Sequence, residues 1–388
     1  MSGARVFLYV QHLLGIGHLK RALTLARSLV AEGLDVTVAS GGPAVPGMTV
    51  DGARFVQLPP ASAADTSFKV LVDESGRGID DEWRQKRGAA LLAAWRTADP
   101  QVLILELFPF GRRQMRFELL PLLEAAAAAT HRPAIVCSVR DVLGGHRNAD
   151  REQETLGLVE RFFDRVLVHG DPSVIGLDRT FPLAARMAER IAYTGYVVDH
   201  SAETGGEAGK GEVIVSAGGG AVGERLLQTA MHARNLTVLR DRIWRVLAGA
   251  NLKNDAFADL ARLAAESGKG RIVLERSRQD FTTLLANCEL SVSQGGYNTL
   301  MEVVQAGARA VAVPFAGGNE TEQTLRASCF AQRGLLEILE ESSLTPASLA
   351  AVIDRAARKP RSGPRPIDLD GAKRSAALIA QWAKERAW

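Results

Sequence analysis

The pattern that most constrains this chain is an apolar strand followed by a glycine-rich turn and a helix, which occurs once in each half. In the first half, Val6–Val10 is followed by a turn at Gly15-Ile16-Gly17-His18 and by a helix that Gly33 ends. In the second half, Val213–Ser216 is followed by a glycine-rich turn at 217–220 and a helix. Further strands alternate with helices in both halves, which predicts parallel sheets. We therefore expect an α/β protein with two Rossmann-like lobes.

The length of the chain also favours two lobes. Its 388 residues exceed the roughly 250–300 at which a single hydrophobic core stops growing. The segment 199–211 is small, polar and rich in glycine, which predicts a linker. We expect an N-terminal lobe over 1–198, a C-terminal lobe over 212–360, and a tail with a helix over 361–388.

The composition excludes several classes of function. A net charge of +3 is too small to predict nucleic-acid binding. The three cysteines, Cys137, Cys288 and Cys329, are scattered without metal-ligand spacing, as is typical of a reducing compartment. No apolar run approaches the roughly 20 residues of a membrane span, and we identify no signal peptide. We expect a cytoplasmic protein.

The most informative stretch is 289–327, in which a strand, a turn at Gly295-Gly296, a helix and a returning strand, Ala310–Phe315, follow one another. Backbone N–H groups at a helix N-terminus favour the binding of phosphate groups. Helical spacing places three polar residues on one face of this helix, namely Asn298, Thr299 and Glu302. A carboxylate there can accept hydrogen bonds from a ribose diol. Because a second polar loop follows at 319–323, the stretch predicts a nucleotide-sugar site.

This stretch resembles the donor-binding signature of GT-B nucleotide-sugar glycosyltransferases, the group related to the N-acetylglucosaminyltransferase of peptidoglycan precursor synthesis. The matching elements are Ser293, Gly296, Thr299, Glu302, Gly307, Val313-Pro314 and Gln323. The sequence departs from the pattern at Glu322, where the peptidoglycan enzyme has histidine. The resemblance implies two lobes whose sheets face a central cleft, with the acceptor bound by 1–198 and the donor by 212–360. It also implies that the terminal helix packs back on the first lobe.

The resemblance also implies which residues hold the donor. Ser216 and the turn that follows it match a second loop near the diphosphate, and three glycines permit close backbone approach; a plain tight turn is the alternative. Glu302 would bind the ribose and Gln323 a sugar hydroxyl. The expected donor-binding residues are Gly17, Ser216, Gly218, Gly219, Gly220, Ser293, Gly295, Gly296, Asn298, Thr299, Glu302 and Gln323.

The first glycine turn lacks the third glycine of a dinucleotide fingerprint, so we do not expect NAD. It resembles the loop after the first strand of GT-B enzymes, which implies that His18 is a general base or a contact to the sugar or acceptor. A histidine near neutral pKa suits proton removal from a hydroxyl. Two alternatives are that His18 only caps its helix and that His12, earlier in the loop, is the base.

Glu106 ends the otherwise apolar strand 102–106, where a charge is costly unless it is paired or exposed in a cleft. It resembles the acidic residue that orients the catalytic histidine in plant-type small-molecule glycosyltransferases. An ion pair with Arg112 or Arg113 is the alternative.

Arginines and aromatic residues mix in the segment that follows, Phe108–Leu120. Arg112 and Arg113 suit an acceptor that carries phosphate or carboxylate, or a membrane surface; a solvated helix face is the alternative. His12 is a further candidate for acceptor contact.

The resemblance implies a bacterial glycosyltransferase, which we expect in the cytoplasm and at the inner face of the membrane, with an anionic or lipid-linked acceptor. We expect a UDP-sugar donor, inversion of configuration, no metal and no cofactor besides the nucleotide sugar. Asp368-Leu-Asp370 has the form of a metal motif, but it precedes the last helix, where a capping role suits Asp370. Two alternatives are a nucleotide-sugar 2-epimerase of the same fold and a non-catalytic nucleotide-sugar-binding partner protein.

Overall fold

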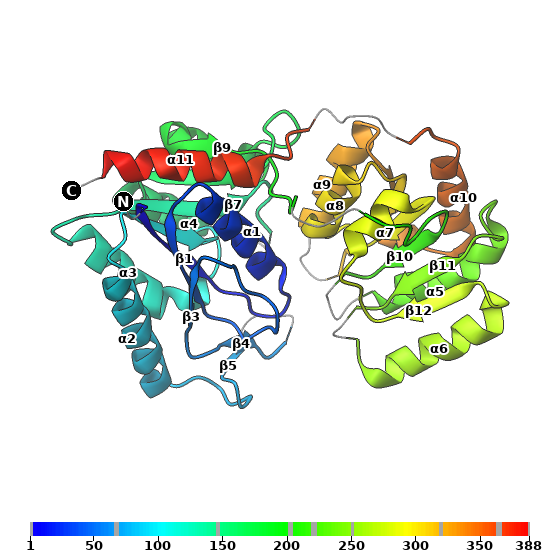
Figure 1. The fold of residues 1–388 in the computed structure, drawn as a ribbon, viewed down its shortest axis with the longest axis horizontal. Helices are drawn as coiled ribbons and strands as arrows, with labels where there is room; N and C mark the ends of the chain where they lie inside the picture. The colour runs from blue at the N-terminus through cyan, green and yellow to red at the C-terminus, as the bar shows by residue number, and fades with distance from the viewer. Residues whose placement is uncertain are drawn as a thin grey trace. The chain divides into compact units, whose positions relative to one another are not determined.

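A computed structural model describes residues 3–65, 70–144, 148–200, 205–218, 223–249, 252–317, 321–361 and 367–386. The chain forms two compact units (Figure 1). Unit 1 comprises Met1–Leu143, Arg147–Val197 and Asp368–Trp388, and unit 2 comprises Gly144–His146 and Val198–Ile367. Apart from the short segment 144–146, the chain leaves the first unit after Val197 and returns to it for its final helix.

Unit 1 is built on a parallel sheet in the order β3-β2-β1-β6-β7-β8-β9. Its strands are β1 (Arg5–Val10), β2 (Asp35–Ser40), β3 (Arg54–Gln57), β6 (Val102–Glu106), β7 (Ala134–Arg140), β8 (Arg165–His169) and β9 (Ile191–Tyr193). A small antiparallel pair, β4 (Ser62–Ala63) and β5 (Leu71–Val72), lies outside this sheet. The helices of unit 1 are α1 (Gly17–Ala31), α2 (Asp81–Ala98), α3 (Arg116–Ala127), α4 (Ala149–Phe162) and α11 (Gly371–Glu385), with 3₁₀ turns at Arg113–Met115, Leu177–Arg179 and Pro182–Arg190.

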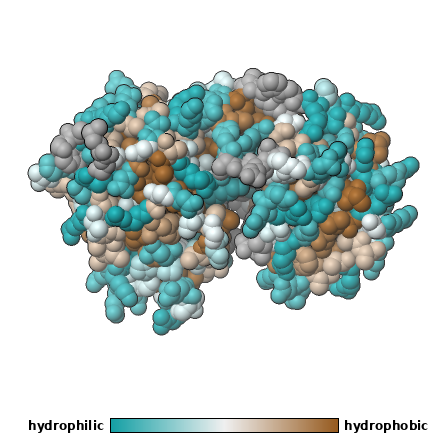
Figure 2. All heavy atoms as spheres, viewed as in Figure 1, coloured by the Kyte–Doolittle hydropathy of each residue, from teal (hydrophilic) through white to brown (hydrophobic). Residues whose placement is uncertain are grey.

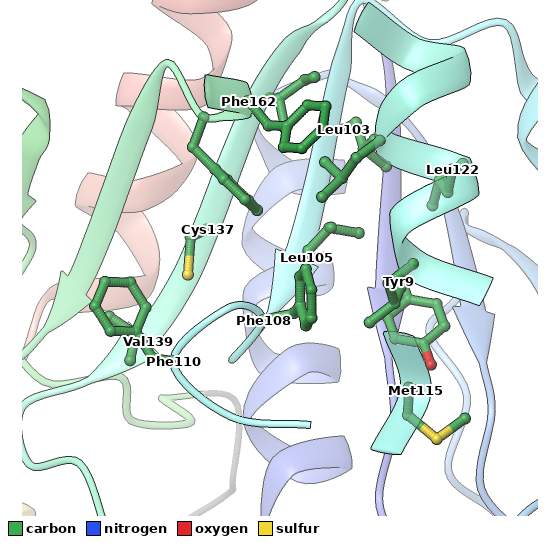
Figure 3. Close-up of a cluster of buried hydrophobic side chains, with 14 of the residues drawn as sticks. Tyr9, Leu103, Leu105, Phe108, Phe110, Met115, Leu122, Cys137, Val139 and Phe162 are labelled. Carbon is green, nitrogen blue, oxygen red and sulfur yellow. The ribbon is translucent and has the colours of Figure 1, made fainter. Parts of the chain in front are cut away.

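Alternate residues of β1 point to opposite faces of the sheet, as the period of a strand requires. Phe7 and Tyr9 join a core with side chains of α2, α3 and α4, and Figure 3 shows part of it around Leu105 and Phe108. Val6 and Leu8 face the other way, into a core that α1 and α11 cover. A parallel sheet that is buried on both faces reads as a nearly continuous apolar run, and the strand Val102–Glu106 is buried throughout.

The last helix, α11, packs along α1 (Figure 1). Ile379 and Trp382 project from α11 into the core beneath α1. Where the chain returns to unit 1, Tyr196 N donates to Asp368 O at 2.7 Å, and Val197 pairs with Asp370 in an antiparallel bridge. The two segments that enter and leave unit 1 are thus joined to each other within it.

Unit 2 has a second parallel sheet in the order β12-β11-β10-β13-β14-β15. Its strands are β10 (Val213–Ser216), β11 (Trp244–Leu247), β12 (Ile272–Glu275), β13 (Leu290–Ser293), β14 (Ala310–Ala312) and β15 (Glu337–Ile338). Its helices are α5 (Glu224–Ala233), α6 (Asn254–Gly268), α7 (Phe281–Asn287), α8 (Tyr297–Gln305), α9 (Glu322–Gln332) and α10 (Pro346–Ala357), with 3₁₀ turns at Arg234–Leu236 and Glu341–Ser343. The polar segment that precedes β10 packs on α7, since the Asn287 side chain donates to the Gly206 and Ala208 carbonyls.

The surface of both units is largely hydrophilic in the view of Figure 2, with hydrophobic side chains in smaller areas. Among the described residues, no helix is both long and apolar enough to cross a membrane.

Several element boundaries differ from the sequence expectation, and β1, for example, begins at Arg5 rather than at Val6. The predicted strand Ala310–Phe315 pairs only over Ala310–Ala312. Pro314 has no N–H to continue the ladder, and the Phe315 N–H donates instead to the Gln323 side chain. The final helix ends at Glu385 rather than at Trp388, and residues 387–388 lie outside the described part of the chain.

The packing of α11 on α1 yields a stability prediction. Ile379→Ala should lower the free energy of unfolding of unit 1 by about 2–5 kcal/mol, because it leaves a cavity in a fully buried core. Lys384→Ala, on the exposed side of the same helix, should change it by less than about 0.5 kcal/mol. Urea denaturation of both variants measures the difference. Equal midpoints would contradict the packing of α11.

Candidate active site

The first cluster of polar side chains lies in unit 1 where β1 and β6 end side by side. The chain turns after β1 and begins α1 at Gly17, so that His18 stands at the start of this helix. His18 Nδ1 lies 3.1 Å from Glu106 Oε1, and the His18 side chain keeps 16% of its surface exposed. The imidazole thus contacts a buried carboxylate on one side and solvent on the other.

Glu106 is 1% exposed, and the described residues that contact its carboxylate include His18, Arg21 and Ser138. Its Oε1 forms an ion pair with Arg21, one turn along α1, and its Oε2 accepts a hydrogen bond from Ser138 Oγ at 2.6 Å. Burial alone would raise the pKa of Glu106. The Arg21 charge and the hydrogen bonds from His18 and Ser138 outweigh burial and hold this pKa well below its usual range. Glu106 is therefore an ionised buried carboxylate that accepts hydrogen bonds only.

The environment of His18 keeps it neutral. Burial first, and then the Arg112, Arg140 and Arg21 guanidinium groups, lower the pKa of His18 well below 6.5, although the Glu106 hydrogen bond opposes them. His18 Nδ1 lies 3.1 Å from Glu106 Oε1, which only accepts, and 3.2 Å from Arg21 Nη2, which only donates. Because Arg21 Nη2 lies closer to Glu106 Oε1 than to the ring, we assign its proton to the carboxylate and the proton of the neutral ring to Nδ1. Nε2 then carries a lone pair, which can take a proton from a hydroxyl.

His12 occupies a different environment. It is 3% exposed, hydrogen-bonds the Pro43 backbone, and packs against Gly42, where an added Cβ would lie 2.4 Å from the imidazole. Burial lowers its pKa. The structure therefore does not bring His12 to the carboxylate that His18 contacts.

The two candidate arginines lie in different environments. Arg112 Nε donates to the Gln11 carbonyl at 2.8 Å, and the Arg112 charge acts on His18. Arg113 forms an ion pair with Glu154 on α4 at 2.8 Å. Arg112 is thus near the His18 cluster, whereas Arg113 belongs to a surface ion pair.

The second cluster lies in unit 2 where β10 and β13 end. Ser216 and Ser293 are direct neighbours in register. After each serine the chain turns through a glycine with positive φ, Gly218 at +71° and Gly295 at +81°, before a helix begins. Such φ angles favour glycine. Gly219 and Gly220 lie outside the described residues.

The helices that follow these turns direct backbone N–H groups to the same edge of the sheet. Within the described part of the chain, no side chain caps the start of α5 at Gly223 or of α8 at Gly296. The Ser216 hydroxyl is buried and has no hydrogen-bond partner among the described residues. Two helix N-termini and a buried donor at one edge are the features of an anion site.

Helix α8 presents the expected polar residues. Asn298 and Thr299 are half-buried in its first turn and Glu302 is buried one turn later. Leu300 and Val303 are almost fully buried.

Side chains in the first turns of α9 contact other segments of unit 2. Gln323 Oε1 accepts from Phe315 N at 3.2 Å. Glu322 forms an ion pair at 3.0 Å with the fully buried Arg326, whose guanidinium lies 4.9 Å from the centre of the Tyr297 ring. Tyr297 begins α8, so Glu322 serves an internal pair that connects the starts of two helices.

Sequence reasoning missed Arg21, Ser138 and His169 as parts of the His18 cluster. Arg21 follows His18 by three residues, a helical spacing that places the two side chains on one face. Ser138 pairs with Glu106 across β6 and β7, which only the sheet order reveals. His169 lies 2.9 Å beyond Ser138. Among the described residues, no group of three or more histidine, cysteine and acidic side chains could hold a metal.

Known proteins resemble the chain most clearly in its C-terminal part. Residues 259–379 match the glycosyltransferase family 28 C-terminal domain. The match includes Glu302 and Gln323, whereas His18, Glu106 and Ser216 lie outside it.

Two curated relatives each match part of the chain, and both are named UDP-N-acetylglucosamine--N-acetylmuramyl-(pentapeptide) pyrophosphoryl-undecaprenol N-acetylglucosamine transferase. The protein from Dichelobacter nodosus (strain VCS1703A) is 35% identical over 74 residues, which cover 19% of this chain and 20% of the relative. The protein from Methylorubrum extorquens (strain PA1) is 30% identical over 123 residues, which cover 30% and 33%. The chain therefore matches about a third or less of the length of these relatives.

Solved structures resemble the whole chain. Acinetobacter baumannii MurG has a TM-score of 0.62 at 16% identity, covering 97% of this chain and 99% of that one. The calicheamicin glycosyltransferase CalG4 has a TM-score of 0.59 at 16% identity, covering 99% and 95%. The glycosyltransferase VinC, solved with dTDP, has a TM-score of 0.60 at 15% identity, covering 98% and 95%. At these identities the likeness shows the fold alone, and it confirms the predicted two-lobed GT-B architecture.

The buried histidines make stability depend on pH. Burial and the Arg21 charge lower the pKa of His169 to about 3, and His18 is lowered in the same direction. In the unfolded chain both titrate near 6.5. As pH falls below about 6.5 the unfolded state binds protons that the folded state does not, so stability falls by up to about 1.4 kcal/mol per pH unit for each histidine.

His169→Gln should therefore flatten the pH dependence of the urea midpoint of unit 1 between pH 7.5 and 5, a window above the range in which most carboxylates titrate. The matched control is His232→Gln, at an exposed histidine of α5, which should keep the wild-type slope. An unchanged slope in His169→Gln would contradict the neutral buried state of His169.

Proposed function

Since the chain has the GT-B fold and carries a glycosyltransferase family 28 C-terminal domain, we propose that it is a glycosyltransferase. It moves a sugar from a nucleoside-diphosphate sugar, with UDP favoured, to an acceptor hydroxyl. The observation that carries this proposal is the neutral His18 held by the ionised, buried Glu106 where β1 and β6 end. Such a pair is chemically suited to deprotonate a hydroxyl.

Unit 2 binds the donor in this proposal. Backbone N–H groups at the starts of α5 and α8, together with the Ser216 hydroxyl, bind the diphosphate. Glu302 accepts hydrogen bonds from the ribose, and Asn298, Thr299 and Gln323 are further donor contacts. The same N–H groups stabilise the charge of the departing diphosphate without a metal.

Unit 1 supplies the base. His18 Nε2 takes the proton of the acceptor hydroxyl while the hydroxyl oxygen attacks the anomeric carbon. The new C–O bond forms opposite the bond to the diphosphate, which breaks with its electron pair, so the configuration inverts. Glu106 stabilises the imidazolium that forms, and Arg21 offsets the cost of burying the carboxylate.

The printed names of the curated relatives support a UDP-sugar donor and a lipid-linked acceptor. Arg112, close to His18, suits an anionic acceptor group. Action in the cytoplasm, at the inner face of a membrane, is consistent with such an acceptor. VinC, which has a similar fold, was solved with dTDP rather than with a uridine nucleotide. We therefore compare UDP with other nucleotides in the binding experiment.

A thermal-shift panel of UDP, GDP, dTDP and their common sugars, with and without magnesium, tests donor binding. A ligand at a hundredfold over its Kd should add about 2.7 kcal/mol to stability. A shift with one nucleotide family that is unchanged by EDTA supports the proposal, and a flat panel overturns it. Release of free nucleoside diphosphate with acceptor separates transfer from 2-epimerisation.

His18→Ala should lower kcat by about 10²–10⁴, because it removes the base, and leave the donor Kd nearly unchanged. His12→Ala is the comparison, with its folding checked by thermal melting, and should retain most of the activity. Nucleotide release and calorimetric titration measure the two quantities. Loss of donor binding with unchanged turnover would contradict the role of His18.

Glu302→Gln should raise the donor KM by about ten- to a hundredfold, the effect of one charge-assisted hydrogen bond of roughly 1.5–3 kcal/mol. The control is Glu266→Gln, which makes the same charge change on the exposed surface of α6. An unaltered KM in Glu302→Gln would rule out the ribose contact.

A further inference from the structure

A chain of buried hydrogen bonds continues from Glu106 away from His18. Ser138 Oγ lies 2.6 Å from Glu106 Oε2 and 2.9 Å from His169 Nε2. His169 Nδ1 lies 2.9 Å from Thr194 Oγ1. The side chains of Ser138, His169 and Thr194 each lie at or below 1% exposure.

The sheet order brings these residues together. Glu106 ends β6, Ser138 lies on the neighbouring β7, His169 ends β8, and Thr194 directly follows β9. Each of these four neighbouring strands thus places a polar residue of the chain at or near its carboxyl end. In a core that is otherwise apolar, every such group requires a partner.

The direction of each hydrogen bond follows from the one before it. Ionised Glu106 only accepts, so the Ser138 hydroxyl donates its single proton to Oε2. Ser138 Oγ can then only accept from His169, which places the His169 proton on Nε2. His169 is neutral, with a pKa lowered to about 3 by burial and by Arg21. Its Nδ1 therefore accepts from the Thr194 hydroxyl at 2.9 Å, which is shorter than the distances from this hydroxyl to Gly195 O (3.1 Å) and Val168 O (3.4 Å).

We propose that Ser138, His169 and Thr194 are positioning residues that hold Glu106 so that His18 keeps its proton on Nδ1 and presents Nε2 to the acceptor. The inference rests on the proposed function for its catalytic meaning, and the hydrogen-bond directions rest on the distances together with an ionised Glu106 and a neutral His169. We call these three residues the relay. None of them touches the reacting atoms.

The relay fixes Glu106 from the side opposite His18. Without the Ser138 donor, Oε2 would lose its short hydrogen bond, and the carboxylate could rotate about its ion pair with Arg21. The far end of the relay is itself anchored, because Thr194 O accepts from Arg374 Nη1 at 3.1 Å, and Gly195 and Tyr196 pack against the returning segment around Asp368. The His18 tautomer therefore depends on groups from several segments of unit 1 that are far apart in the sequence.

The direct test is the tautomeric state of the two histidines, read from ¹⁵N chemical shifts of histidine-labelled full-length protein at pH 7.5. His18→Ala and His169→Gln assign the signals. The relay requires the Nδ1–H form for His18 and the Nε2–H form for His169. In Ser138→Ala, His169 should lose this single form and His18 should show a mixture. A His169 that carries its proton on Nδ1 in the wild type would overturn the proposal.

Kinetics provide the second readout. Ser138→Ala and His169→Phe should each lower kcat by about ten- to a hundredfold, as is typical for groups that orient a catalytic residue, with the donor KM within about twofold. His169→Gln keeps an N–H near the position of Nε2 and should recover most of the loss. The matched control is Ser375→Ala, which removes a buried hydroxyl that bonds its own helix backbone in α11. It should leave kcat unchanged.

The outcomes separate this inference from the proposed function. If His18→Ala retains full activity, the base assignment fails whatever the relay does. If His18→Ala is inactive while Ser138→Ala keeps wild-type kcat and tautomers, the relay is wrong and the base assignment stands. Equal losses in Ser138→Ala and Ser375→Ala would assign the effect to stability alone and overturn the relay.

Discussion

The ionised Glu106 carboxylate, buried where β6 ends, is the constraint on which the arrangement of unit 1 depends. A charge at 1% exposure is tolerated only with close compensation, and Arg21 supplies it from α1. That ion pair fixes the first turns of α1 over the sheet and therefore fixes His18. Since α11 covers the same side of the sheet as α1, the returning end of the chain contributes to the stability of the site without touching it.

In unit 2, backbone N–H groups at helix N-termini supply the positive charge at the edge of the sheet. Neighbouring strands end in Ser216 and Ser293, and each continues through a positive-φ glycine into a helix. The two helix N-termini thus create positive potential at this edge of the sheet. Glu322, which departs from the family pattern, is committed to Arg326 and through it to Tyr297. This position therefore holds the starts of α8 and α9 together, and a sugar contact there would compete with a buried ion pair.

The sequence predicted the parts of the fold that depend on local pattern. Apolar runs such as Val213–Ser216, bounded by glycine turns, became buried parallel strands, because period and turn chemistry are local properties. The half-buried edge strand β9 carries little of that signal. His18 and Glu106 were individually identifiable, but Ser138 and His169 were not, because strand order and register join residues far apart in the chain. Likewise, the sequence alone does not distinguish His12 from His18, because only the packing of the loops shows that His12 is buried.

The central claim is that the protein binds a nucleoside diphosphate at the two serine–glycine turns of unit 2. Hydrogen–deuterium exchange of the full-length protein with and without saturating UDP tests it most directly, with GDP and dTDP as comparisons. The account predicts slower exchange in peptides covering 213–218 and 290–302, where the backbone N–H groups would contact phosphate, and the same protection in EDTA. Protection confined to other segments, or none with any of the three nucleotides, would contradict it.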